Sequence, residues 1–216
     1  MLRFPASQHR APLRLLGVAA LFSGAALVAH ITTGISLPGA LLMTSAAVAT
    51  TCIVVWRRTS PGARMVLRRV VAIGAVSGVA ATGVYDLSKA ALSSFDSSSY
   101  NPFETIRVFG TLLTGGTPSV VAAYAVGALY HLLNGTAFGV AFCLLFGRRG
   151  ALAGIAWALG LECLQLTLYP GWLGIRQYRE FMQFSTLGHV CYGAVLGVMC
   201  RRLLSTLAAV SSGSSR

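Results

Sequence analysis

Residues 70–92 read VVAIGAVSGVAATGVYDLSKAAL, and this stretch decides the fold class. Asp86 and Lys89, both near its end, are its only charged residues. A helix needs about 20 mostly apolar residues to cross the hydrocarbon core of a membrane, which is about 30 Å thick. The stretch meets both conditions, and we therefore predict that it is a transmembrane helix.

The composition of the whole chain also indicates a membrane protein. Of its 216 residues, 55% are hydrophobic and 10% are charged, and the mean hydropathy is +0.71. About 25% of the residues of a soluble domain are charged, because its surface must face water. We predict a single all-α domain over residues 1–216, built as a polytopic integral membrane helical bundle.

Six segments are long and apolar enough to be transmembrane helices. They are 13–34, 36–56, 70–92, 118–147, 150–170 and 184–208. Two other segments mix aromatic and charged residues with apolar ones, as helices at a membrane interface do; they are 102–113 and 172–183.

The basic residues predict the orientation of these spans. With six spans, thirteen of the 17 basic residues fall on one side of the membrane, and the four on the other side are Lys89, Arg107, Arg176 and Arg179. Basic residues concentrate in cytoplasmic loops. We therefore predict a multi-pass protein of the plasma (inner) membrane with both termini in the cytoplasm. The net charge of +12 follows from these loops, so we expect no nucleic-acid partner.

Pairs of glycines four residues apart predict which spans pack closely. Such pairs let two helix backbones approach each other, and they are Gly74 with Gly78, Gly135 with Gly139, and Gly193 with Gly197. We therefore place spans 70–92, 118–147 and 184–208 at the centre of the bundle. Spans 13–34 and 36–56 carry few polar residues and are expected to form an outer wall.

The acidic residues and two histidines gather toward one side of the membrane. The chain has five acids, all outside or in the outer half of a predicted span: Asp86, Asp96, Glu104, Glu162 and Glu180. His131 and His189 lie near the middle of their spans. Ionisable groups inside a membrane are costly unless they face the protein interior or water, which makes them candidates for function.

Helical spacing places further polar residues on the same faces. Asn134 follows His131 by three residues, while Gln165 and Tyr169 follow Glu162 at three and seven. We predict that the spans direct these side chains into one cavity open to the extracytoplasmic side. The predicted catalytic residues are Glu162, His131, His189 and Asp86. The predicted substrate-binding residues are Asn134, Gln165, Tyr169 and Arg107.

Three kinds of chemistry fit this cluster. His131, His189 and Glu162 would form a two-histidine, one-carboxylate metal site with open positions that suit iron or zinc. Without a metal, a buried carboxyl group and a histidine would act as general acid and base. The same groups would also serve as a proton relay in a carrier. A purely structural role is the fourth possibility, since polar side chains also hold membrane helices together.

The function expected from the sequence is that of an integral membrane enzyme acting on a hydrophobic or lipid-linked small molecule at an outward-facing polar site. The alternatives are a small carrier coupled to protons and an accessory subunit of a membrane complex. The bilayer itself is the expected partner, with a second copy or a partner subunit as further options.

Overall fold

The computed structural model describes residues 10–213. These residues form eight helices and no strand. The helices are α1 (Arg10–Ala19), α2 (Phe22–Thr33), α3 (Leu37–Arg58), α4 (Pro61–Ser93), α5 (Glu104–Thr114), α6 (Val120–Phe146), α7 (Ala151–Leu173) and α8 (Tyr178–Gly213). The predicted all-α fold is confirmed.

The helices match the six predicted spans in position. Five of them, α3, α4, α6, α7 and α8, are long and apolar enough to cross a membrane. Helices α1 and α2 pass the same test only when taken together, and they bend by 49° at the break between them. At this break the Leu21 amide donates to the carbonyl of Val18, three residues back, so the chain tightens for one turn.

Of the two predicted interfacial segments, one forms a helix of its own and the other does not. The predicted helix 102–113 is α5, which begins after Asn101 accepts a hydrogen bond from the Phe103 amide at 3.0 Å. The segment 172–183 is not a separate helix. The chain continues through Pro170 to the end of α7, turns at Gly174 with a φ of 61°, and starts α8 at Tyr178.

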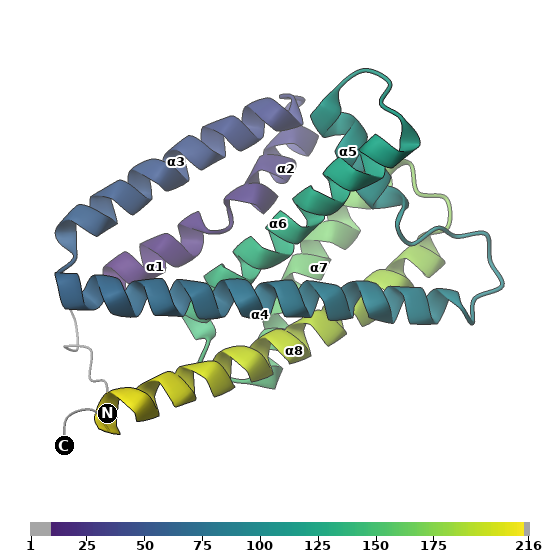
Figure 1. The fold of residues 1–216 in the computed structure, drawn as a ribbon. Helices are drawn as coiled ribbons and strands as arrows, with labels where there is room; N and C mark the ends of the chain where they lie inside the picture. The colour runs from purple at the N-terminus through teal and green to yellow at the C-terminus, as the bar shows by residue number, and fades with distance from the viewer. Residues whose placement is uncertain (1–9, 214–216) are drawn as a thin grey trace.

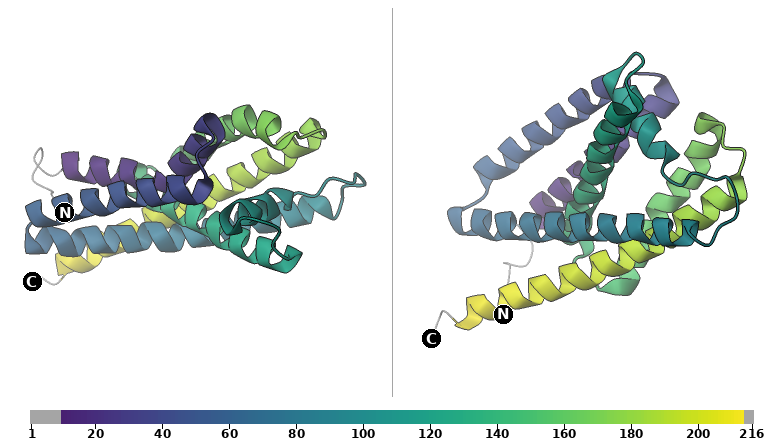
Figure 2. Two further views of the ribbon diagram at one scale, coloured as in Figure 1. Left: turned by 90° about the horizontal axis from the view of Figure 1, so that it is seen from above. Right: turned by 45° about the vertical axis from the view of Figure 1, so that its right-hand side comes forward.

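The bundle is organised around α4, which packs against both α6 and α8. Helix α7 packs on α8, α5 packs on α6, and α3 packs beside α1 and α2 at the edge of the molecule (Figure 1). The start of α1 and the end of α8 lie at the same end of the bundle, and α5 lies at the opposite end (Figure 2).

Glycines form the central helix crossings, as the sequence predicts. A Cβ atom on Gly78 of α4 would lie 2.6 Å from the carbonyl oxygen of Gly135 on α6, and one on Gly139 would lie 2.6 Å from that of Gly74. Helices α7 and α8 cross in the same way, because a Cβ on Gly193 would overlap the backbone of Gly154. Only backbones without side chains fit at these distances.

Candidate functional site

A polar cavity lies inside the bundle, under α5. It encloses about 100 Å³ and receives side chains from α4, α5, α6, α7 and α8. Its polar lining consists of Thr82, Tyr85, Lys89, Tyr100, Thr105, His131, Asn134, Gln165, Tyr169, Ser185, His189 and Tyr192. At about 30 Å³ per water molecule, the cavity has room for roughly three waters or a small head group.

Helix α5 closes this cavity as a fixed roof. A Cβ on Gly110 of α5 would overlap the carbonyl of Ala123 on α6, and a Cβ on Gly127 of α6 would overlap that of Ile106. The two helices therefore touch backbone to backbone. The face of α5 that carries Thr105, Ile106 and Phe109 is held over the cavity.

Glu162 of α7 is the most buried acidic side chain of the described chain, with a relative exposure of 2%. The close glycine crossing of α7 and α8 lets the short side chains of α8 reach it. Ser185 donates to its Oε2 at 2.7 Å and Thr186 donates to its Oε1 at 3.2 Å. Such donors offset the cost of taking a carboxylate out of water.

His189 completes this cluster from the next turn of α8. Its Nδ1 lies 2.8 Å from Oε2 of Glu162 and 2.9 Å from the carbonyl oxygen of Ser185. Both neighbours are hydrogen-bond acceptors, so Nδ1 carries the proton. The other ring nitrogen, Nε2, has no hydrogen-bond partner within residues 10–213. Because His189 lines the cavity, this nitrogen is left for a guest molecule.

A second histidine–carboxylate pair lies on the neighbouring helices. Nε2 of His131 on α6 is 3.0 Å from Oδ1 of Asp86 on α4. The ring of Tyr85 lies between the two histidines, with its centroid 5.6 Å from that of His131 and 5.1 Å from that of His189. Gly188 makes room for this ring, since a Cβ there would lie 2.6 Å from Tyr85 Cε2.

This geometry does not support the predicted metal site. Among residues 10–213, no three His, Cys, Asp or Glu side chains come close enough together to hold a metal ion. His189 pairs with Glu162 and His131 pairs with Asp86, so the three predicted ligands do not converge. The physical reason is the ring of Tyr85, which separates the two pairs.

The structure places three of the four predicted substrate-binding residues at the cavity. Gln165 donates to Ser185 at 2.8 Å, and Tyr169 and Asn134 also line the space. The Oδ1 atom of Asn134 is buried and has no hydrogen-bond partner among the described residues. An unpaired buried acceptor is costly, so a donor on a bound molecule would be favoured here.

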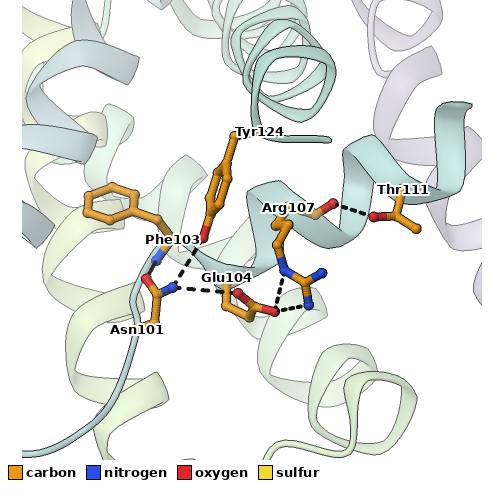
Figure 3. A network of polar contacts seen from close by, with 6 residues as sticks. All are labelled: Asn101, Phe103, Glu104, Arg107, Thr111 and Tyr124. Carbon is orange, nitrogen blue, oxygen red and sulfur yellow. Dashed lines mark hydrogen bonds and ion pairs between the residues drawn. The ribbon is translucent and has the colours of Figure 1, made fainter. Parts of the chain in front are cut away.

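Arg107, the fourth predicted residue, lies away from the cavity. It forms an ion pair with Glu104 on the same helix, and both side chains are more than 40% exposed. Figure 3 shows Arg107 turned toward Glu104, while Tyr124 of α6 accepts a hydrogen bond from Asn101 at 3.2 Å. Glu104 raises the pKa of Arg107, first through the hydrogen bond between them and then through its negative charge.

Seven residues of the polar lining were not predicted as site residues, and Tyr100 and Lys89 are two of them. Tyr100 enters from the loop before α5, and burial followed by the charge of Glu162 raises its pKa to about 12, so its hydroxyl keeps its proton at neutral pH. Lys89 follows Asp86 by three residues on α4, a spacing at which side chains of opposite charge can pair. In the structure Asp86 is taken by His131, and the ammonium of Lys89 lies over the rings of Tyr85 and Phe103 instead.

An apolar groove of about 530 Å³ adjoins the polar cavity. It runs between α2 and α7, whose contact is slight, and α6 forms its floor. Asn134, Gln165, Tyr169 and His189 line both the groove and the cavity. The polar cavity and the apolar groove are therefore adjacent and share these four side chains.

Comparison with protein-family models, with curated proteins and with solved structures found no match for this chain. The fold and the site define a class of protein: a multi-pass helical membrane protein with a buried polar cavity. The residues of that cavity determine which chemistry it can support.

Proposed function

We propose that the protein is an integral membrane enzyme that acts on a lipid-like molecule by acid–base chemistry. The observation that supports this most directly is the pair of Glu162 and His189 at the edge of the cavity. Glu162 is anchored by Ser185 and Thr186, and its Oε2 lies 2.8 Å from Nδ1 of His189, while the Ser185 carbonyl accepts the hydrogen bond from that nitrogen.

In this proposal His189 is the general base and Glu162 its positioning residue. A carboxylate on Nδ1 holds the imidazole in the tautomer whose Nε2 is free to accept a proton. Nε2 takes the proton of a water or of a substrate hydroxyl as that oxygen attacks an ester carbonyl carbon of the lipid, and the imidazolium returns the proton to the alkoxide that leaves when the ester C–O bond breaks. The Glu162 carboxylate stabilises the imidazolium that forms, as the carboxylate of a hydrolase triad does.

The apolar groove supports a hydrophobic substrate. A molecule that enters between α2 and α7 would keep its chain in the groove and bring its polar end to Asn134, Gln165 and His189. A site for a water-soluble substrate would not need an apolar passage on the side of a bundle. The expected substrate is therefore an amphiphile drawn from the bilayer.

The test compares Glu162→Gln and His189→Ala with wild type and with a matched control, Glu180→Gln. Purified proteins in neutral detergent are incubated with a total lipid extract, and lipid species are compared by mass spectrometry. We expect one lipid class to be consumed by wild type and by Glu180→Gln only. Loss of a general base typically costs 10²–10⁴-fold in rate. Identical lipid profiles for all four proteins and a blank would contradict the proposal.

A proton-coupled carrier is the second candidate, and the pair of His131 and Asp86 is the observation in its favour. It supplies a second titratable pair only a tyrosine ring away from the first. A carrier would acidify or alkalise the lumen of proteoliposomes when substrate is added, without changing the substrate. An enzyme changes the substrate and leaves the lumen pH constant.

A further inference from the structure

Lys89 is the only lysine of the chain; the other 16 basic residues are arginines. It lies near the outer end of α4 and has a relative exposure of 8%, and it lines the polar cavity. Its ammonium is 5.0 Å from the ring centroid of Tyr85 and 5.4 Å from that of Phe103. Two aromatic faces thus hold the cation in place at the roof of the cavity.

No carboxylate oxygen within residues 10–213 lies within ion-pair distance of this ammonium. The acids of the two neighbouring pairs are both engaged, Asp86 with His131 and Glu162 with His189. A buried cation needs a hydrogen-bonded partner of opposite charge, and the aromatic rings supply only part of that stabilisation. The cavity is therefore suited to a guest that brings the missing negative charge.

Asn134 adds a second requirement on the same guest. Asn134 lines both the cavity and the apolar groove, and its Oδ1 is buried without a hydrogen-bond partner among the described residues. This atom can only accept a hydrogen bond, so the guest must offer a donor there. The groove is lined mostly by apolar residues, Asn134 lines both spaces, and Lys89 lines the cavity.

We propose that the substrate is a single-chain lipid phosphate with a free hydroxyl group. This inference rests on the proposed enzyme and names the substrate class of its site. The acyl or alkyl chain occupies the groove between α2 and α7, the hydroxyl donates to Asn134, and the phosphate is bound by Lys89. The hydroxyl then lies beside His189, which also lines the junction.

Binding of two lipids tests this inference separately from catalysis. The probes are a lysophosphatidate and a monoacylglycerol with the same chain, which lacks the phosphate. Their dissociation constants are measured on the detergent-solubilised protein by native mass spectrometry. We expect wild type to bind the phosphate lipid at least 10-fold more tightly, and Lys89→Met to bind both equally while keeping its affinity for monoacylglycerol, which also reports that it is folded.

Two further variants separate the effect of Lys89 from surface charge and from catalysis. Arg107→Gln deletes an exposed cation at the same end of the bundle and should keep the preference; a loss as large as that of Lys89→Met would assign the effect to surface charge and overturn the proposal. Glu162→Gln should bind the phosphate lipid at least as tightly as wild type, even if it is inactive. The binding preference is thus measured independently of catalysis, and it can hold even if the acid–base proposal is wrong.

Three binding results would overturn the inference. Equal affinity of wild type for the two lipids would show that Lys89 does not bind a lipid phosphate. If Lys89→Met does not fold, Lys89→Gln replaces it. A variant of Lys89 that still prefers the phosphate lipid over monoacylglycerol as strongly as wild type would also show that Lys89 does not bind the phosphate. Displacement of the phosphate lipid by equimolar inorganic phosphate would assign the site to a free anion instead of a lipid.

Discussion

The crossing of α4 and α6 makes Gly78→Ala a sharp test of the fold. The added Cβ would lie 2.6 Å from the Gly135 carbonyl oxygen and 2.9 Å from Thr136 Cα, where ordinary contact begins at 3.4 Å. Both neighbours are backbone atoms and cannot rotate away, so the helices must separate by about 0.8 Å. Overpacking of this kind costs about 1–3 kcal/mol.

Gly83→Ala on the same helix is the matched control. Nothing lies within 4 Å of the Cβ it would add. Alanine is favoured over glycine inside a helix by about 0.5–1 kcal/mol, and both variants receive this gain. The difference between them therefore reports the contact with α6 alone.

The assay is the free energy of unfolding in mixed micelles, from titration with a denaturing detergent followed by circular dichroism. We expect Gly78→Ala to unfold at lower detergent fraction than wild type and Gly83→Ala at an equal or higher one. Equal stability of the two variants would refute the close crossing of α4 and α6. The placement of Asp86 beside His131 would then lose its basis, because these residues lie on those two helices.

Three smaller changes probe other parts of the molecule. Tyr192→Phe removes a buried hydroxyl that donates to the Gly135 carbonyl at 2.7 Å, and we expect a loss of about 0.5–1.5 kcal/mol in the same unfolding assay; no change would mean that the bond is absent. Arg107→Gln should leave stability unaltered, because its ion pair with Glu104 is exposed, and a clear loss would show that the pair is shielded from water. A reporter that is active only in the cytoplasm should be active when fused into the α6–α7 loop, and a reporter that is active only outside should be active when fused into the α4–α5 loop. The reverse pattern would contradict the predicted orientation.

The spans were predictable because hydrophobic length is a property of each segment by itself. The glycine pairs on α4, α6 and α8 also identified the central helices, since close approach has a signature in the sequence. The partner glycine on α7, Gly154, was missed, although Gly150 precedes it by the same four residues.

The pairing of the site residues could not be predicted in the same way. Helical spacing shows which side chains share a face, but not how one helix is rotated relative to the next. Spacing along α4 therefore does not show that Asp86 contacts His131 on α6. The same gap explains the metal hypothesis, which needed His131 and His189 to meet where Tyr85 lies.

The two ends of the bundle differ in charge, and this difference opposes turning the molecule over in a membrane. Exposed arginines lie at the end of α3, in the first turns of α4 and in the α6–α7 connection, and none of these arginines pairs with an acid among the described residues. Turning the bundle over would carry each of them through hydrocarbon at a cost of at least about 2.5 kcal/mol. We therefore expect that the bundle does not turn over once it is inserted, so that the end covered by α5 stays on one side of the membrane.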